Sequence, residues 1–378
     1  MGSKHRVMAI LTGVLMGLGV ACGGGGQSVP MAVSKPKVRV VPVATGLTRP
    51  WGLAFLPNGD MLVTERPGTL KRIPKNGGSP QAITGVPEVV AQGQGGLLDV
   101  VLHPEFEQNR WVYLSLAAGQ PGQAGTRVVR GQLQGNQLQN LETIVDMPLK
   151  TGSGQHFGSR LVFDPQGKLY VGTGDRGQPQ RAQDLGDHAG KVLRLEADGS
   201  IPGDNPRPAG GRPEVYSWGH RNIQGMVVHP ETGRIWLHEH GPRGGDEINI
   251  VQAGGNYGWP LVSFGVEYSG QPVGTGLTSL PGLIPPIWHW TPSIAPSGMA
   301  FYTGTVFPEW QGNLFVGALA GQHLARLELN GETVVREERL LQGTVGRIRD
   351  VRQGPDGFLY LLTDSEQGQL LRLEREPI

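Results

Sequence analysis

One histidine lies in a glycine-rich segment, where it could accept a proton from a bound molecule. Residues 151–160 are rich in glycine and contain a single histidine, His156. Imidazole is the side chain most often used as a general base near neutral pH. Glycine lets the backbone approach a bound molecule closely. We therefore expect His156 to act as a general base, although a lone histidine also occurs commonly in a purely structural role.

Arginines occupy two further segments that suit an anionic ligand. Arg221 and Asn222 lie in the unusual stretch 218–225, and Arg347 and Arg349 are two residues apart near the C-terminus. Alternate residues of a strand point the same way, so the second pair would present two cations side by side. Such a pair suits a polycarboxylate, while a solvated surface strand would explain it equally well.

A third segment, residues 238–260, has the oxygen donors that calcium prefers. Gly241 and Pro242 offer backbone carbonyls, and Asp246 and Glu247 follow with carboxylates. His238 and His240 would share a strand face, but no third ligand is evident and we expect a structural role for them. Taken together, a base, several arginines and a carbonyl-rich loop indicate an anionic cofactor held by a metal.

Other chemistries are excluded by motif and composition. Residues 186–191 fall one position short of a phosphate-binding loop, and residues 92–96 open no dinucleotide-binding unit. No nucleophile elbow occurs. The chain has 33 Lys and Arg against 32 Asp and Glu, a net charge of +1, so no nucleic-acid partner is expected. Cys22 is the only cysteine, which excludes internal disulfides.

The elements that must position these residues are predicted to be β-strands. The chain has 61 Gly and 30 Pro, which favours turns over helices. A unit of proline, turn and apolar strand recurs six times, with its proline at positions 57, 104, 165, 230, 308 and 355. About four strands fit in each unit, which is typical of a propeller blade. We predict an all-β fold, a six-bladed β-propeller of four-stranded blades over residues 40–378, in preference to two stacked β-sandwiches.

The N-terminus resembles an export signal. Lys4 to Arg6 precede an apolar run over residues 7–20, which is too short to span a bilayer. We predict an export signal over residues 1–21 and a flexible tether over residues 22–39. Lipidation of Cys22 would make an exported protein, periplasmic or anchored to the outer membrane, that touches the membrane only through its lipid. An ordinary signal peptide is the alternative.

Several motifs in the same order resemble the bacterial aldose sugar dehydrogenases that use pyrroloquinoline quinone (PQQ), relatives of soluble glucose dehydrogenase. The motifs occupy residues 93–99, 155–156, 219–225, 239–249, 254–260, 295–297 and 347–350. The resemblance covers the chain from about residue 40 to residue 373. It implies a six-bladed propeller that oxidises the C1 hydroxyl of aldoses to lactones, with hydride transfer to PQQ and electrons leaving to an unidentified acceptor.

The resemblance also implies roles for individual residues. His156 is expected to take the hydroxyl proton, with Arg221 beside it in the catalytic site. Six residues are expected to bind the cofactor: Gln94, Asn222, Arg347, Arg349, Gly241 and Pro242. The carbonyls of Gly241 and Pro242 are also expected to hold Ca²⁺ against PQQ, and Glu247 with the Tyr257 carbonyl resembles a second calcium site.

The chain departs from the family pattern in three places. Gln155 stands where soluble glucose dehydrogenase has an aspartate, so His156 is expected to lack an anionic neighbour. Ala320 replaces a cofactor-binding lysine, for which Arg243 could compensate. Trp288 and Trp290 lie near the position where relatives stack an aromatic ring over the cofactor.

Two alternative functions remain open. Six-bladed propellers also include calcium-dependent hydrolases that act on lactones, although those use more carboxylates than these motifs contain. A propeller that kept the scaffold and lost catalysis could instead be a binding protein of the cell envelope, and Ala320 favours that alternative.

Overall fold

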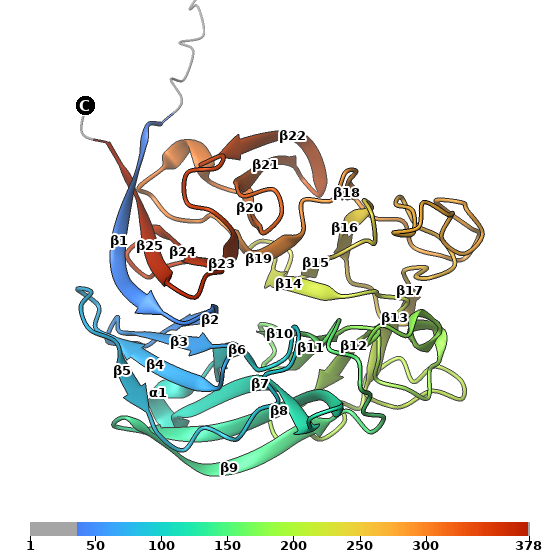
Figure 1. The fold of residues 1–378 in the computed structure, drawn as a ribbon, viewed down its shortest axis with the longest axis horizontal. Helices are drawn as coiled ribbons and strands as arrows, with labels where there is room; N and C mark the ends of the chain where they lie inside the picture. The colour runs from blue at the N-terminus through green and yellow to red at the C-terminus, as the bar shows by residue number, and fades with distance from the viewer. Residues whose placement is uncertain (1–35, 377–378) are drawn as a thin grey trace, which may run out of the picture. The chain divides into compact units, whose positions relative to one another are not determined.

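The structure is a computed structural model that describes residues 36–376. Its strands form six antiparallel sheets that surround one central axis, as Figure 1 shows. Five sheets have four strands, and the third gains a short parallel strand, β17 (Gly255–Asn256), at its outer edge. The predicted six-bladed propeller is confirmed.

Each blade begins with a strand beside the axis. The inner strands are β2 (Pro50–Phe55), β6 (Leu97–Leu102), β10 (Gly158–Phe163), β14 (Ile223–Val228), β19 (Pro296–Phe301) and β23 (Ile348–Gln353). The second strands are β3 (Met61–Glu65), β7 (Trp111–Gln120), β11 (Leu169–Thr173), β15 (Ile235–Glu239), β20 (Leu314–Ala318) and β24 (Leu359–Thr363).

Two further strands complete each blade. The third strands are β4 (Thr69–Ile73), β8 (Gln123–Gln134), β12 (Lys191–Leu195), β16 (Asp246–Ile250), β21 (Leu324–Asn330) and β25 (Gly368–Arg375). The outermost strands are β5 (Gln81–Ile83), β9 (Gln137–Asp146), β13 (Val215–Trp218), β18 (Trp288–Trp290), β22 (Thr333–Leu340) and β1 (Val38–Leu47).

The recurring proline marks the turn between the first two strands of a blade. In the first blade, Pro57 lies in the turn from β2 to β3, and the Leu56 amide donates to the Asp60 carbonyl at 2.7 Å. Gly59 has a φ of +87°, a conformation that glycine adopts without steric cost. The repeat therefore fixes where each inner strand ends.

The ring is closed by strands from both ends of the described chain. β1 pairs antiparallel with β25, from Val38 opposite Arg375 to Leu47 opposite Gly368. The last blade is thus built from the start and the end of the propeller, which leaves no open seam. β1 begins two residues before residue 40, the predicted start of the domain.

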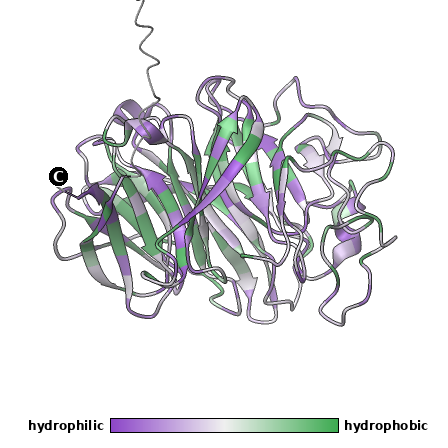
Figure 2. Ribbon diagram, turned by 90° about the horizontal axis from the view of Figure 1, so that it is seen from above, coloured by the Kyte–Doolittle hydropathy of each residue, from purple (hydrophilic) through white to green (hydrophobic). Residues whose placement is uncertain are grey.

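The core lies between neighbouring blades. Strand side chains such as Leu62, Leu114, Leu314 and Leu361 are almost completely buried, and hydrophobic residues concentrate on the strands (Figure 2). Burial of each such side chain contributes about 1.5–3 kcal/mol. A rigid scaffold of this kind can hold side chains at its mouth in fixed positions.

Helices contribute little to the described residues. They form one α-helical turn, α1 (Phe106–Asn109), and two 3₁₀ turns, Pro179–Gln183 and Pro308–Trp310. No helix formed by residues 36–376 has the length and apolar character needed to span a membrane. The predicted export signal and Cys22 lie outside the described residues.

Candidate functional site

The predicted residues gather at one mouth of the propeller because of strand polarity. Inner and second strands are antiparallel, so the start of each inner strand lies beside the end of the second strand. Ile223 lies opposite Glu239, for example, and Ile348 opposite Thr363. Residues that follow a second strand therefore meet those that begin an inner strand.

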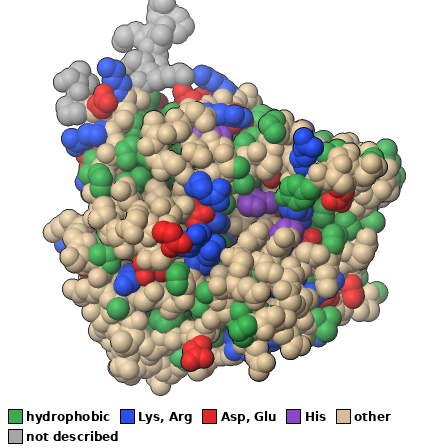
Figure 3. Space-filling model, viewed as in Figure 1, with side chains coloured by type: hydrophobic (Ala, Val, Ile, Leu, Met, Phe, Trp, Pro, Cys, Tyr) green, Lys and Arg blue, Asp and Glu red, His purple; other side chains and the backbone are tan. Residues whose placement is uncertain are grey.

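A cavity of about 300 Å³ opens at this mouth. We call it the larger cavity, in contrast to the narrow cavity beside Arg221. Four of the predicted cofactor-binding residues line it: Gln94, Asn222, Arg347 and Arg349. Trp51 and Phe157 supply aromatic walls. Figure 3 shows basic and histidine side chains gathered in the hollow centre of this face. The two arginines predicted to bind a polycarboxylate therefore line the same cavity as Gln94 and Asn222.

His156 is held at the edge of this cavity by a carboxylate. Its Nδ1 lies 2.6 Å from Oδ1 of Asp175, which is completely buried. The other Asp175 oxygen accepts a hydrogen bond from the Trp259 indole at 2.8 Å. Oε1 of Gln94, itself a cavity-lining residue, accepts the His156 backbone N–H at 2.9 Å. His156 does not itself line the cavity, whereas Phe157 and Gly158 do.

The expectation that His156 lacks an anionic neighbour is therefore wrong. Gln155 indeed precedes it, but Asp175 arrives from the loop after β11 and bonds directly to the imidazole. The sequence analysis missed Asp175 because it and His156 lie in two different loops, which only the pairing of β10 with β11 brings together. Its signal was its place two residues beyond the end of a second strand.

Arg347 and Arg349 converge on one carboxylate, Asp364. Arg347 bonds to Oδ2 of Asp364 at 3.1 Å and Arg349 to the same oxygen at 3.3 Å. Burial raises the pKa of Asp364, but Arg349 and Arg347 lower it by more, so that it lies below its ordinary value. Burial also lowers the pKa of Arg349 to about 10. The buried Nε of Arg349 has no hydrogen-bond partner among the described residues.

Arg221 lies at a second, narrow cavity on the same side. It shares this cavity with Gly241, Glu247 and Tyr257, and His240 borders both cavities. The guanidinium of Arg221 donates to the Gly241 carbonyl at 2.8 Å. Pro242 lines neither cavity.

Two carboxylates meet at the narrow cavity. Glu247 lies opposite Glu239 on the neighbouring strand of the blade. Burial and the charge of Glu239 raise the pKa of Glu247 to about 8. Asn249 donates to both carboxylates, at 3.2 and 3.3 Å, while its buried Oδ1 has no hydrogen-bond partner within residues 36–376. A buried pair of acids beside an unpaired carbonyl oxygen is the environment that a cation would stabilise.

Asp246 proves to be a loop anchor. Its Oδ1 accepts the Gly241 amide at 2.9 Å, and its Oδ2 accepts Ser293 Oγ and the amides of Ile294 and Ala295. It is fully buried with both oxygens used, so the expectation that it supplies an oxygen to a metal is not supported. Instead it fixes the backbone that presents the Gly241 carbonyl.

The two histidines of this segment are held by backbone carbonyls. His238 Nε2 donates to Ser297, and His240 Nε2 donates to Pro296 at 2.6 Å. Burial lowers the pKa of His240 to about 3. Within the described part of the chain, no three His, Cys, Asp or Glu side chains are grouped to hold a metal ion.

The other residues named for departures from the family pattern do not line either cavity. Ala320 is exposed next to Leu319, which lines the larger cavity. Arg243 is exposed and lines neither cavity. Trp288 and Trp290 belong to the outermost strand β18, where they pack against the interior of the blade, so neither faces the cavity. Their suggested role in stacking on a cofactor is therefore wrong.

A buried ion cluster fills the channel behind the larger cavity. Arg160 lies 3.2 Å from Asp99 and 3.2 Å from Asp350, and Arg352 contacts the same two acids. Arg160 also donates to the Arg349 carbonyl at 3.1 Å, and its guanidinium lies over the Trp51 ring. Asp99 and Asp350 belong to sequence motifs named above, but their pairing with Arg160 was not predicted because the three residues come from different blades.

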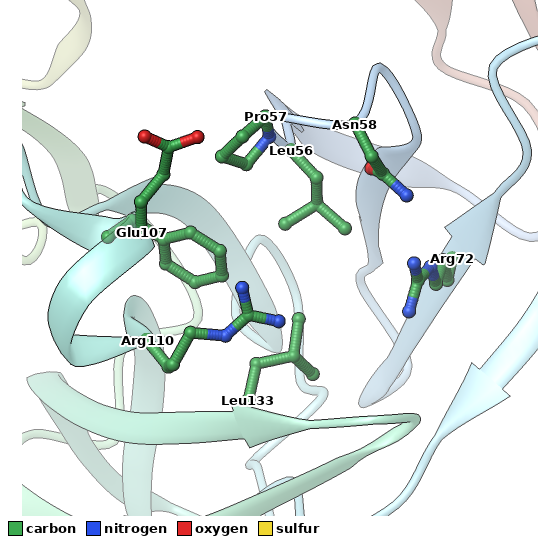
Figure 4. A pocket seen from close by; sticks show the side chains of 8 residues that line it. Leu56, Pro57, Asn58, Arg72, Glu107, Arg110 and Leu133 are labelled. Carbon is green, nitrogen blue, oxygen red and sulfur yellow. The ribbon is translucent and has the colours of Figure 1, made fainter.

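Two other cavities contain none of the predicted residues. One of about 500 Å³ lies at the opposite ends of the inner strands and has mainly apolar walls. The other, of about 440 Å³, lies between the first two blades, where Arg72 and Arg110 point toward it (Figure 4). Neither is lined by a histidine together with an arginine, so the mouth that contains His156 is the better candidate.

Comparison with known proteins agrees with this geometry. Residues 47–372 match the family model described as glucose/sorbosone dehydrogenase. The chain is 46% identical to the aldose sugar dehydrogenase YliI of Escherichia coli (strain K12), over 86% of this chain and 90% of the relative.

Solved structures give the same result. The apo form of the soluble aldose sugar dehydrogenase from Escherichia coli matches with a TM-score of 0.87 and 45% identity, over 90% of this chain and 100% of that one. The PQQ-bound aldose sugar dehydrogenase of Streptomyces coelicolor matches with a TM-score of 0.74 and 31% identity, over 90% and 100%. The chain belongs to the glucose/sorbosone dehydrogenase family.

Proposed function

We propose that this protein oxidises the C1 hydroxyl of aldose sugars to lactones with PQQ and Ca²⁺ as cofactors. The observation that carries the proposal is one mouth of the propeller, where an arginine-lined cavity adjoins a buried His156–Asp175 pair. The first is an anion site, and the second is a general base with its orienting carboxylate. An anionic redox cofactor and an alcohol substrate need that combination.

The cavity fits a polycarboxylate. Within residues 36–376, Arg347 and Arg349 have Asp364 as their one ionic partner, and the buried Nε of Arg349 has no acceptor. An incoming carboxylate would satisfy that donor, and guanidinium groups bind carboxylates with strong, directional hydrogen bonds. Gln94 and Asn222 would contact the cofactor from the other walls. When bound, PQQ would accept the C1 hydride and Ca²⁺ would polarise it as a Lewis acid.

The donors for calcium are backbone and carboxylate oxygens. The Gly241 carbonyl accepts one bond from Arg221, which leaves it a second lone pair, and Pro242 offers another carbonyl. The cofactor would supply the remaining ligands of the calcium ion. Glu247 and the Tyr257 carbonyl would hold a second ion, which the buried acid pair favours.

His156 is the residue that would accept the hydroxyl proton. Donation from Nδ1–H to Asp175 leaves the lone pair on Nε2, where a substrate hydroxyl can be deprotonated. Asp175 also stabilises the imidazolium that forms. Trp259 donates to the other oxygen of Asp175, which is completely buried, and Arg221 lies over the Trp259 ring.

Reconstitution tests the proposal. The metal-free, cofactor-free protein should oxidise aldoses with an artificial dye as electron acceptor once PQQ and Ca²⁺ are added, and not with either alone. His156→Ala should lose turnover while it still binds PQQ. Retention of turnover in that variant would remove the base assignment.

Two further measurements separate the alternative functions: lactone hydrolysis without PQQ, and PQQ binding followed by heat and absorbance. Asp99 and Asp350, the channel carboxylates, are paired with Arg160 and Arg352, which argues against a calcium-dependent hydrolase. Metal-dependent lactone hydrolysis without PQQ would establish one nonetheless. If PQQ produced neither heat nor a spectral change, a binding propeller would be the better description.

Export and lipid anchoring belong to the same proposal. They rest on the predicted signal and Cys22, which lie outside the described residues. Substitution Cys22→Ser should release the protein from membranes into the soluble fraction if Cys22 carries a lipid.

A further inference from the structure

The larger cavity contains more positive charge than the predicted arginine pair provides. Arg49 and Arg66 also line it, so four guanidinium groups face one lining carboxylate, Asp364. Both come from the first blade, immediately before β2 and after β3, across the seam from the last blade. The sequence prediction included neither of them.

Arg66 stands out because the acids nearest to it are already bound by other arginines. Asp364 is bound by Arg347 and Arg349, and Glu366 is bound by Arg49 at 2.5 Å. The side chain of Arg66 is half-buried and has no hydrogen bond or ion pair with any described residue. Burial and the charge of Arg49 lower its pKa, and the charges of Asp364 and Glu366 offset this only in part. A half-buried cation beside other cations is a costly arrangement that an anion would relieve.

The backbone holds Arg66 in this position. Its N–H donates to the Arg49 carbonyl at 3.0 Å, and its own carbonyl accepts the Leu97 N–H at 3.0 Å. Gly96 allows this close packing, because a Cβ there would lie 1.9 Å from the Arg66 carbonyl oxygen. The side chain is thus presented to the cavity from a backbone fixed on both sides.

We propose that Arg66, supported by Arg49, forms an anion subsite that binds a carboxylate of the cofactor on the first-blade side of the cavity. The inference rests on the proposed function and extends it. Arg347 and Arg349 would bind one end of a polycarboxylate, and Arg66 would bind a carboxylate across the seam. The subsite supplies a cation in a chain that has Ala320 instead of lysine near the same cavity.

Calorimetric titration of PQQ into the apo-protein, in the presence of Ca²⁺, tests the subsite. Arg66→Gln should weaken binding about ten- to hundredfold, because it removes a charged hydrogen bond. Arg66→Lys should recover part of the loss. Arg336→Gln, which removes an exposed arginine from the outermost strand β22, is the matched control and should bind as the native protein does.

Thermal unfolding of the same apo-proteins distinguishes a binding role from a structural one. The Arg66 side chain has no hydrogen bond or ion pair with residues 36–376, so Arg66→Gln should leave the melting temperature nearly unchanged or raise it. The affinity of the native protein should also fall more steeply with salt than that of the variant. Equal affinity in Arg66→Gln and the native protein would overturn the subsite and leave the proposed function standing. A native protein that binds no PQQ would overturn both.

Discussion

His156 and Asp175 form a hydrogen-bonded pair of 2.6 Å, although 19 residues separate them in the sequence. Both lie in loops of the third blade, before β10 and after β11, and antiparallel pairing of these strands brings the loops together. Gly158 has a φ of +62° beside Thr173, where a Cβ would lie 2.4 Å from the Thr173 carbonyl carbon. The loop therefore needs glycine there to bring His156 close to Asp175.

Asp175→Asn should reduce kcat by at least about a hundredfold. The amide keeps the shape of the carboxylate, but it can present NH₂ to Nδ1 and so favour the tautomer with its proton on Nε2. It also no longer stabilises the imidazolium. Steady-state turnover measures the loss, and PQQ titration should show little change in affinity. Asp204→Asn, at an aspartate whose side chain is 71% exposed, is the control. Native kcat in Asp175→Asn would show that the pair does not support the base.

The sequence predicted the architecture because its signals are local. Each blade carries its own proline turn between an inner and a second strand, as at Pro57 and Pro308, so the repeat could be counted without any long-range information. The arginine pair was accessible for the same reason, since Arg347 and Arg349 lie at the start of one inner strand.

The missed residues depend on contacts between distant segments. Arg66, Asp175 and Asp364 all follow the end of a second strand, at the mouth where the inner strands begin. Aligning the six repeats on their turns would have placed them there. The cluster around Arg160 has no such register, because its ion pairs cross the channel between blades.

Calcium should stabilise the protein through Glu247. Burial and the charge of Glu239 raise the pKa of Glu247, so a cation bound beside Glu247 would favour its ionised form. Calcium added to the chelator-treated protein should raise the melting temperature by several degrees, and Glu247→Gln should lose that increase. Scanning calorimetry with and without Ca²⁺ measures it. Glu142→Gln, at a half-exposed glutamate on β9, serves as the control. An equal increase in Glu247→Gln would place the stabilising ion elsewhere.

The buried Lys191 should make stability depend on pH. Its ammonium donates to the carbonyls of Arg181, Ala182 and Ala189, and burial lowers its pKa to about 7 from 10.5. Between these values the unfolded chain binds a proton that the folded chain does not, so the free energy of unfolding should rise with pH. The rise is up to about 1.4 kcal/mol per pH unit.

Lys191→Met isolates this contribution. The variant should show a flatter profile than the native protein when urea unfolding is followed between pH 7 and 10. Lys168→Met removes a lysine that pairs with Glu196 at the surface and controls for a general charge effect. Parallel profiles of the native protein and Lys191→Met would show that Lys191 titrates normally.

Arg160 should be the most costly of the channel residues to replace. Its guanidinium donates to Asp99 and to the carbonyls of Gln224 and Arg349, and it forms an ion pair with Asp350. It also lies over the Trp51 ring, so it ties four blades to its own. Among the described residues, Arg160→Met leaves Arg352 as the one cation paired with the two acids, and it removes the hydrogen bond to the Arg349 carbonyl. We expect a loss of about 3–5 kcal/mol in the free energy of unfolding, measured with urea. Arg336→Met, at an exposed arginine, should change it by less than about 0.5 kcal/mol. A loss of that smaller size in Arg160→Met would mean that water or Arg352 can take over its contacts, and that the cluster does not hold the blades together.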